Sequence, residues 1–140
     1  MSHFDYHVRV GYADVDQMGF VHHSRYLVYL ESARTELLRT TGTSYREWEA
    51  RGVLLPLTGC ELQYRRAARY DDEVLVRTHL ATFSRTRVSF RYEVLLRSDE
   101  SLLATGRTDH FFMSPDGKPI RCPAELLALL QPFAPADPAP

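Results

Sequence analysis

The sequence predicts one domain of the α+β class, in which a long helix packs on an antiparallel sheet. The chain has 140 residues, which is enough for a single domain to bury a core. Residues 4–12 alternate between apolar and polar side chains, as a half-buried strand does, and a helical period begins at Ser24. Four more stretches with a two-residue period follow, joined by short turns. Consecutive strands after a helix favour an antiparallel meander that curls around that helix.

The long helix is predicted to run from Ser24 to the residues before Gly42, which is a natural stop signal. Apolar side chains recur on one face over about five turns. Those side chains are Leu27, Leu30, Ala33, Leu37 and Leu38. Because Tyr26, Val28 and Tyr29 add apolar surface on other sides, we expect the helix to be enclosed.

Two shorter helices are predicted from their start signals. The capping box Ser44-x-x-Glu47 opens the first of them. The second is expected over residues 122–130, with Pro123 in its first turn.

The later strands are separated by turn signals, and Pro56 makes the preceding apolar segment an edge or a bend. These strands are expected near residues 60–65, 74–80, 88–94 and 102–113. We expect residues 1–131 to form the single domain. The Pro/Ala-rich residues 132–140 are predicted to be a disordered tail.

The composition is that of an ordinary soluble globular protein, with 44% hydrophobic and 25% charged residues. A net charge of −1 gives no indication of a nucleic-acid or membrane-surface partner. Cys60 and Cys122 form neither a metal-type spacing nor a disulfide framework. No signal peptide and no apolar run of membrane-spanning length is visible, so the predicted location is the cytoplasm.

Asp14 and Asp16 lie in the loop between the first strand and the long helix. A polar turn explains them, because Asp side chains often accept hydrogen bonds from nearby backbone N–H groups. A second interpretation is a catalytic carboxylate held close to a helix N-terminus, where backbone N–H groups bind oxyanions. Since residues i and i+2 of an extended chain diverge, the two carboxylates are not expected to serve the same chemistry.

Metal binding by this loop is disfavoured. Asp14-x-Asp16-x-x-Gly19 matches the opening of a calcium loop, but Met18 and Arg25 occupy positions that require oxygen ligands. The adjacent His22 and His23 have no third histidine at helical spacing for zinc. These two histidines are expected either to cap or pack at the helix start or to lie beside a reacting group.

For four arginines near strand ends the favoured interpretation is a solvated charge, and the alternative is a patch that contacts phosphate groups. They are Arg65, Arg66, Arg85 and Arg87. Gly19 permits a tight turn or a close approach of substrate. By pattern alone, Tyr26, Tyr29 and Trp48 are core or interface aromatics. The sequence has no P-loop, no G-x-G-x-x-G and no G-x-S-x-G, which argues against kinase, dinucleotide and serine-hydrolase chemistry.

The stretch around the loop resembles the signature of hotdog-fold acyl-CoA thioesterases, and it is most similar to the 4-hydroxybenzoyl-CoA thioesterase and YbgC-like branch. The motif reads Tyr12-x-Asp14-Val15-Asp16-x-x-Gly19-Phe20-Val21-x-His23-x-x-Tyr26-x-x-Tyr29-Leu30-Glu31-x-Ala33-Arg34. This resemblance implies a curved antiparallel five-stranded sheet wrapped around a long central helix. It also implies a homodimer formed by sheet pairing, or a homotetramer, with active sites at the dimer interface.

The resemblance further assigns roles to residues. Asp16 would be the catalytic carboxylate, as general base or as nucleophile. The backbone N–H of His23 would polarise the thioester carbonyl, and its imidazole would belong to the site. No cofactor or metal is implied. The residues assigned to binding of the acyl-CoA substrate are Gly19, Val21, Tyr26, Arg65, Arg85 and Arg87.

Other functions stay open at this point. Hotdog domains also serve as non-catalytic acyl-CoA sensors, and fold does not determine function. An acyl-carrier-protein thioester could replace acyl-CoA as substrate. A hotdog hydratase or dehydratase is a third possibility, but its acid–histidine arrangement is not found in this sequence.

Overall fold

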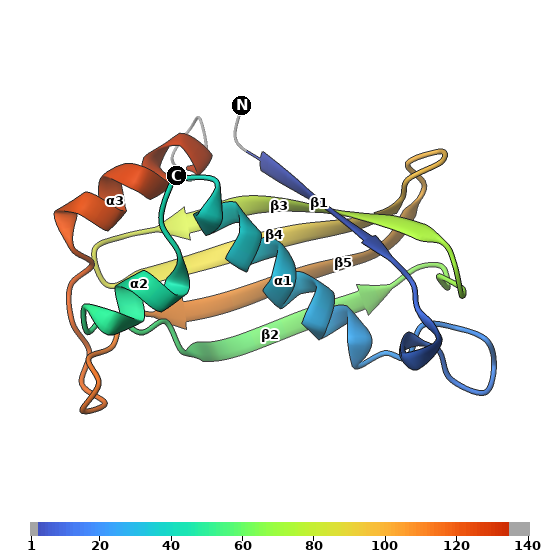
Figure 1. Ribbon diagram of the computed structural model, residues 1–140, viewed down its shortest axis with the longest axis horizontal. Coiled ribbons are helices and arrows are strands. Elements are labelled where there is room, and N and C mark those ends of the chain that lie inside the picture. The colour runs from blue at the N-terminus through green and yellow to red at the C-terminus, as the bar shows by residue number, and fades with distance from the viewer. Residues whose placement is uncertain (1–2, 135–140) are drawn as a thin grey trace.

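In the computed structural model, which describes residues 3–134, a single curved sheet carries the helices on one of its faces (Figure 1). The predicted α+β class and the five-stranded antiparallel sheet are confirmed. Within residues 3–134, no helix is long and apolar enough to cross a membrane. The elements are β1 (His3–Arg9), the 3-10 helix η1 (Tyr12–Asp14), α1 (Arg25–Arg39), α2 (Tyr45–Ala50), β2 (Leu57–Tyr64), β3 (Glu73–Phe83), β4 (Arg87–Leu96), β5 (Leu102–Phe111), α3 (Ala124–Leu130) and the 3-10 helix η2 (Gln131–Phe133).

The strand order is β1-β3-β4-β5-β2, and all neighbouring strands are antiparallel. The strands β3, β4 and β5 form the predicted meander. Both edges of the sheet come from earlier parts of the chain, since β1 pairs with β3 and β2 pairs with β5. As a result, the end of β1 and the end of β2 lie at the same end of the sheet, close to the start of α1 (Figure 1).

The helix α1 crosses one face of the sheet and buries Leu30, Ala33 and Leu37 completely. It has 15 residues, about four turns, and is thus shorter than the sequence predicts. It packs against β5 at Gly106, where a Cβ atom would lie 3.0 Å from Leu30 Cδ1. Gly106 therefore provides the space in which this helix packs.

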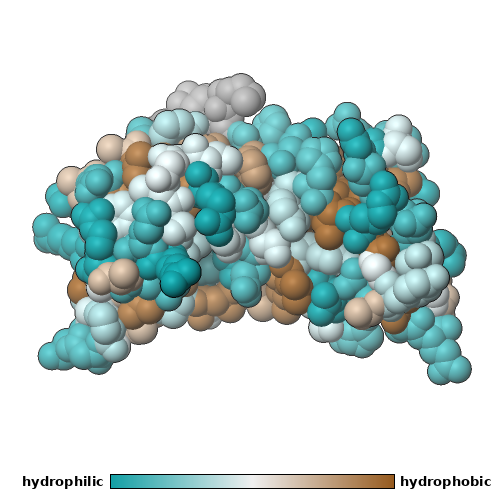
Figure 2. All heavy atoms as spheres, viewed as in Figure 1, coloured by the Kyte–Doolittle hydropathy of each residue, from teal (hydrophilic) through white to brown (hydrophobic). Residues whose placement is uncertain are grey.

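One side of α1 remains exposed in the single chain, contrary to the expectation that the helix is enclosed. Leu27 and Val28 are 38% and 43% exposed, and Leu57 on the edge strand β2 is 46% exposed. Figure 2 shows hydrophobic surface along its lower margin, the side on which β2 forms the edge of the sheet.

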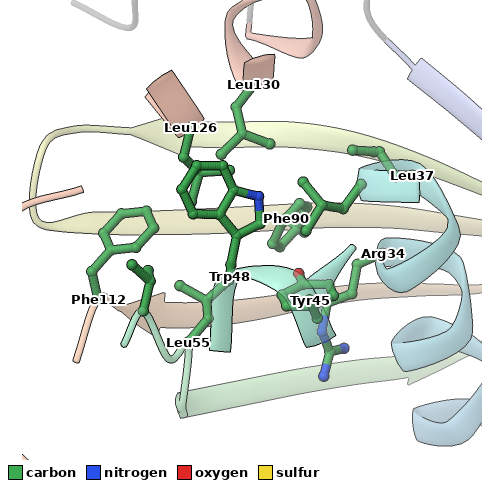
Figure 3. A pocket seen from close by; sticks show the side chains of 11 residues that line it. Arg34, Leu37, Tyr45, Trp48, Leu55, Phe90, Phe112, Leu126 and Leu130 are labelled. Atoms are coloured by element: carbon green, nitrogen blue, oxygen red, sulfur yellow. The ribbon is translucent and has the colours of Figure 1, made fainter. Parts of the chain in front are cut away.

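The far end of the core is closed by α2 and α3. Trp48 is 2% exposed and lies between Leu126, Leu130 and Phe90, as Figure 3 shows. The space that remains beside it is about 20 Å³ and almost entirely apolar. A cavity of this size holds about one water molecule, so it is part of the packed core and not an acyl-binding pocket.

Several predicted boundaries need correction. β1 ends at Arg9, because the chain turns into η1, and Tyr12 is 79% exposed instead of facing the core. The last strand ends at Phe111, before residue 113. Gln131–Phe133 form a short 3-10 helix at the start of the predicted tail, and residues 135–140 of that tail lie outside the described residues.

Candidate functional site

The loop between β1 and α1 is a narrow hairpin held by backbone hydrogen bonds. The Asp16 N–H donates to Phe20 O at 2.8 Å, and the His22 N–H donates to Asp14 O at 2.8 Å. Gly19 adopts a φ of +82°, a conformation that side chains rarely allow, and so makes the turn. The Val21 N–H donates to Ala68 O at 2.8 Å, which fastens the hairpin to the segment after β2.

Asp16 is partly exposed at the open side of this hairpin. Its Oδ1 accepts hydrogen bonds from the Met18 N–H at 2.9 Å and from the Phe20 N–H at 3.3 Å. Its Oδ2 has no hydrogen-bond partner in residues 3–134. The carboxylate is thus oriented through one oxygen, and the other oxygen is available to a bound molecule.

Asp14, in contrast, is buried and fully engaged. Its Oδ2 accepts from the Gly11 N–H at 2.9 Å, and its Oδ1 accepts from Arg25 Nε at 2.8 Å. Burial alone would raise the pKa of Asp14, but the hydrogen bonds from the Gly11 N–H and from Arg25, together with the positive charge of Arg25, outweigh it and lower the pKa. Asp14 is therefore an ionised residue that fixes the loop to α1, and it has no oxygen left for chemistry.

His23 lies directly before α1. Its carbonyl oxygen accepts a hydrogen bond from the Tyr64 hydroxyl at 3.0 Å, whereas its backbone N–H has no acceptor in the described part of the chain. The imidazole of His23 is exposed and packs on that of His22, with 4.0 Å between ring centroids. A free N–H at a helix start is suited to binding an oxyanion, because it adds to the positive end of the helix dipole.

Asp16 and His23 line the same open cleft, which has a volume of about 260 Å³. Its wall is formed on one side by the hairpin and the first turn of α1, and on the other by the end of β2 and the residues after it. The lining residues are Asp16, Met18, Phe20, Val21, His23, Tyr26, Tyr64, Arg65, Arg66 and Ala67.

The structure brings together most of the predicted site residues. Val21 and Tyr26, which are 5% and 2% exposed, form the floor of the cleft, and Arg65 lies at its rim. Gly19 forms the turn beside it.

Arg85 and Arg87 are not part of this cleft. They lie in the β3–β4 turn and at the start of β4, at the opposite end of the sheet from Asp16 (Figure 1).

Four cleft residues were not predicted as site residues from the sequence, namely Met18, Phe20, Tyr64 and Ala67. The first two belong to the hairpin itself, so their proximity to Asp16 could have been inferred from the tight turn at Gly19. Tyr64 comes from a strand that is distant in sequence, and only the pairing of β2 with β5 places it there.

No group of three or more His, Cys, Asp or Glu side chains in residues 3–134 is arranged to hold a metal ion. Among the groups described, the cleft presents the carboxylate of Asp16 and the backbone N–H of His23.

Comparisons with known proteins identify relatives of this chain. The model of the thioesterase-like superfamily matches residues 10–130. The acyl-CoA thioesterase YbgC of Haemophilus influenzae is 33% identical over 93 residues, which cover 66% of this chain and 68% of that protein.

Two solved structures have the same fold. A hypothetical protein from Thermus thermophilus is 40% identical, with a TM-score of 0.87, and the match covers 92% of this chain and 98% of that chain. The DHNA-CoA thioesterase from Staphylococcus aureus is 30% identical, with a TM-score of 0.82, and the match covers 86% of this chain and 81% of that chain.

Proposed function

Since this chain belongs to the thioesterase-like superfamily, we propose that it hydrolyses acyl-CoA thioesters to a free acid and coenzyme A, with Asp16 as the catalytic carboxylate. The family expected from the motif over residues 12–34 is confirmed, and the chain is a thioester hydrolase. One observation carries the role of Asp16. Its Oδ1 is held by two backbone N–H groups, while its Oδ2 has no partner in residues 3–134 and lies in a cleft shared with the His23 N–H.

The proposed chemistry needs only these groups. The thioester carbonyl oxygen would accept a hydrogen bond from the His23 N–H, where the start of α1 stabilises the negative charge that develops. Asp16 would then take a proton from a water molecule that attacks the carbonyl carbon. The tetrahedral intermediate collapses by breaking the carbon–sulfur bond, and the coenzyme A thiolate leaves and takes up a proton.

A nucleophilic route is equally compatible with the free Oδ2 of Asp16. In that route Oδ2 attacks the carbonyl carbon, expels the thiolate and gives a mixed anhydride, which water then hydrolyses. A single turnover in ¹⁸O-water, followed by mass spectrometry of the peptide containing Asp16, reveals a nucleophile if ¹⁸O enters the Asp16 carboxylate.

The role of Asp16 is tested by Asp16→Asn, which keeps the size of the side chain and removes its basicity. We expect thiol release from acyl-CoA to fall by about 10³-fold or more, with an unchanged thermal midpoint, because the side chain is partly exposed. Asp116→Asn is the matched control, since Asp116 is an exposed carboxylate in a turn at the other end of the molecule. Wild-type turnover by Asp16→Asn would refute the proposed mechanism.

The substrate class is tested separately with acetyl-, butyryl-, decanoyl- and benzoyl-CoA, and with the same acyl groups on an acyl carrier protein. Thiol release from the coenzyme A series supports the proposal. Turnover of only the carrier-protein series would assign the alternative substrate. Tight binding of acyl-CoA without release of thiol would assign the sensor function.

We also propose that the protein acts as a homodimer or homotetramer, in which a second chain covers the exposed side of α1 and the sheets together wrap the helix. The exposed Leu27, Val28 and Leu57 support this, because they form apolar surface along α1 and the free edge at β2. In such an assembly Arg65 would meet the coenzyme A phosphates from the same chain as Asp16, and Arg85 and Arg87 from another. Light scattering during gel filtration measures the oligomeric state directly.

A further inference from the structure

We propose that the stacked rings of Tyr12 and Tyr70 bind the adenine ring of coenzyme A, and that Arg69 contacts the adjoining phosphates. This proposal rests on the proposed acyl-CoA thioesterase function and deepens it, because it assigns the nucleotide end of the substrate to named residues.

The first observation is the exposure of this aromatic pair. The two ring centroids are 4.1 Å apart, and the ring planes differ by 11°. Tyr12 is nevertheless 79% exposed and Tyr70 44% exposed. Each ring covers one face of the other, so the outer face of Tyr12 is open to solvent. An exposed flat aromatic surface of this kind is suited to stacking of a nucleobase, since every base has a π-face.

The second observation is that Arg69, which precedes Tyr70 in the chain, contacts the hairpin that lines the cleft. Phe20 lines the cleft that contains Asp16. The Arg69 guanidinium lies over the Phe20 ring, 4.8 Å from its centroid, and next to Gly19. Tyr70 follows Arg69 in the chain. Followed through these contacts and then along the chain, the groups run from the Asp16 carboxylate to Arg69 and on to Tyr70, the same order as thioester, phosphates and adenine in coenzyme A.

The third observation is the charge between the cleft and the stack. Arg65, Arg66 and Arg69 have no carboxylate within 4.0 Å among residues 3–134. The neighbouring carboxylates are engaged elsewhere, since Asp72 accepts from the Arg69 N–H at 2.9 Å and Asp71 lies 3.7 Å from Arg9. Unpaired guanidinium groups beside an open cleft are suited to phosphate, which they bind with two parallel hydrogen bonds.

The test compares a substrate that has the nucleotide with one that lacks it. Tyr12→Ala removes the stacking surface, and Tyr12→Phe keeps it. For the acyl-CoA that the wild type hydrolyses fastest, we expect Tyr12→Ala to raise KM about tenfold and to leave kcat unchanged, because stacking of one base contributes about one order of magnitude in affinity. For the same acyl group on pantetheine, which has no adenine or 3′-phosphate, we expect equal kinetics for all three proteins.

A binding measurement separates this proposal from the proposed function. Calorimetric titration with 3′,5′-ADP uses only the nucleotide end and does not depend on turnover. Weaker binding to Tyr12→Ala than to wild type and Tyr12→Phe supports the adenine site, even if no thioester is hydrolysed. Equal binding of 3′,5′-ADP to all three proteins would overturn it, as would equal changes in KM for the coenzyme A and pantetheine substrates.

Discussion

Arg25 and Asp14 join the first turn of α1 to the loop that carries the candidate carboxylate, with Arg25 Nε donating to Asp14 Oδ1 at 2.8 Å. The side chain of Asp14 is 10% exposed and that of Arg25 is 38% exposed, so only the carboxylate of the pair is largely shielded from solvent. The contact fixes the direction in which α1 leaves the loop. It therefore also fixes the position of the His23 N–H relative to Asp16.

The first prediction concerns Asp14→Asn. We expect it to lower the free energy of unfolding by about 2 kcal/mol, because it weakens two hydrogen bonds to a buried charge. Since the folded protein lowers the pKa of Asp14 below 3.8, the ionised carboxylate contributes stability above pH 3.8 that is lost as the pH falls further. Thermal midpoints measured from neutral to acidic pH should show that the difference between wild type and Asp14→Asn shrinks below pH 3.8. If the difference in thermal midpoint stays constant below pH 3.8, the ionised carboxylate of Asp14 is not the source of this stability.

The second prediction concerns His110, which is 2% exposed on the helix side of β5. Its Nε2 lies 2.9 Å from Thr108 Oγ1, which in turn lies 2.7 Å from the Tyr92 hydroxyl. Burial lowers the pKa of His110 to about 4, and the positive charge of Arg34 adds to this effect. The folded protein therefore holds His110 neutral at pH values where the unfolded chain is protonated.

The consequence is a loss of stability in mild acid. Between pH 6.5 and about 4 the unfolded state binds one proton more than the folded state at this residue. The free energy of unfolding should decrease by up to about 1.4 kcal/mol per pH unit, and the loss should level off below the folded pKa. Urea unfolding across this range measures the slope. His110→Gln should be less stable at neutral pH, and its free energy of unfolding should depend less steeply on pH. If the pH dependence is the same as in the wild type, another group is responsible for it.

The third prediction concerns Tyr64→Phe. The Tyr64 hydroxyl donates to the carbonyl oxygen of His23, so its removal should loosen the peptide that precedes α1 without removing any reacting group. We expect kcat to fall by about three- to tenfold and KM to change little, with less than about 1 kcal/mol lost in stability. Tyr6→Phe is the control, since the Tyr6 hydroxyl has no hydrogen-bond partner within the described residues. Equal kcat values for the two variants would argue against a positioning role.

The fourth prediction concerns the contact between α1 and β5. In Gly106→Ala the new Cβ would lie 3.0 Å from Leu30 Cδ1 and 3.2 Å from Leu62 Cδ2, so these two side chains must give way by a few tenths of an ångström in a packed core. We expect a loss of about 1–3 kcal/mol in the free energy of unfolding. Gly59→Ala on β2 meets only Asp109 Oδ2 at 3.4 Å and should cost less. Denaturant unfolding of both variants checks this, and similar losses would mean that helix packing is not the cause.

The sequence predicted those helices, strands and turns that depend on patterns within a few neighbouring residues. The two-residue alternation after Phe4, the helical period after Ser24 and the capping box at Ser44 all predict elements that the structure contains. The turn at Gly19 was also predicted, and so was the divergence of Asp14 and Asp16, whose carboxylates have different hydrogen-bond partners in the structure.

What the sequence could not provide was the pairing of distant segments. Alternation identifies strands but not their neighbours, so the position of β2 beside β5 was not predicted, nor was the placement of Tyr64 in the cleft. Arg85 and Arg87 were grouped with Arg65 because all three lie near strand ends. A strand has two ends, however. Only the pairing register shows that Arg65 lies at one end of the sheet and that Arg85 and Arg87 lie at the other.

The hairpin that carries Asp16 also has a consequence for protein engineering. Its carboxylate is oriented by the backbone N–H groups of residues 18 and 20, and every residue type except proline supplies such a group at position 18. Gln17 and Met18 are both exposed, and Met18 lines the cleft. A combinatorial library at these two positions would therefore vary the shape of the cleft entrance while the Asp16 carboxylate stays in place, which makes the hairpin a natural starting point for directed evolution of acyl preference.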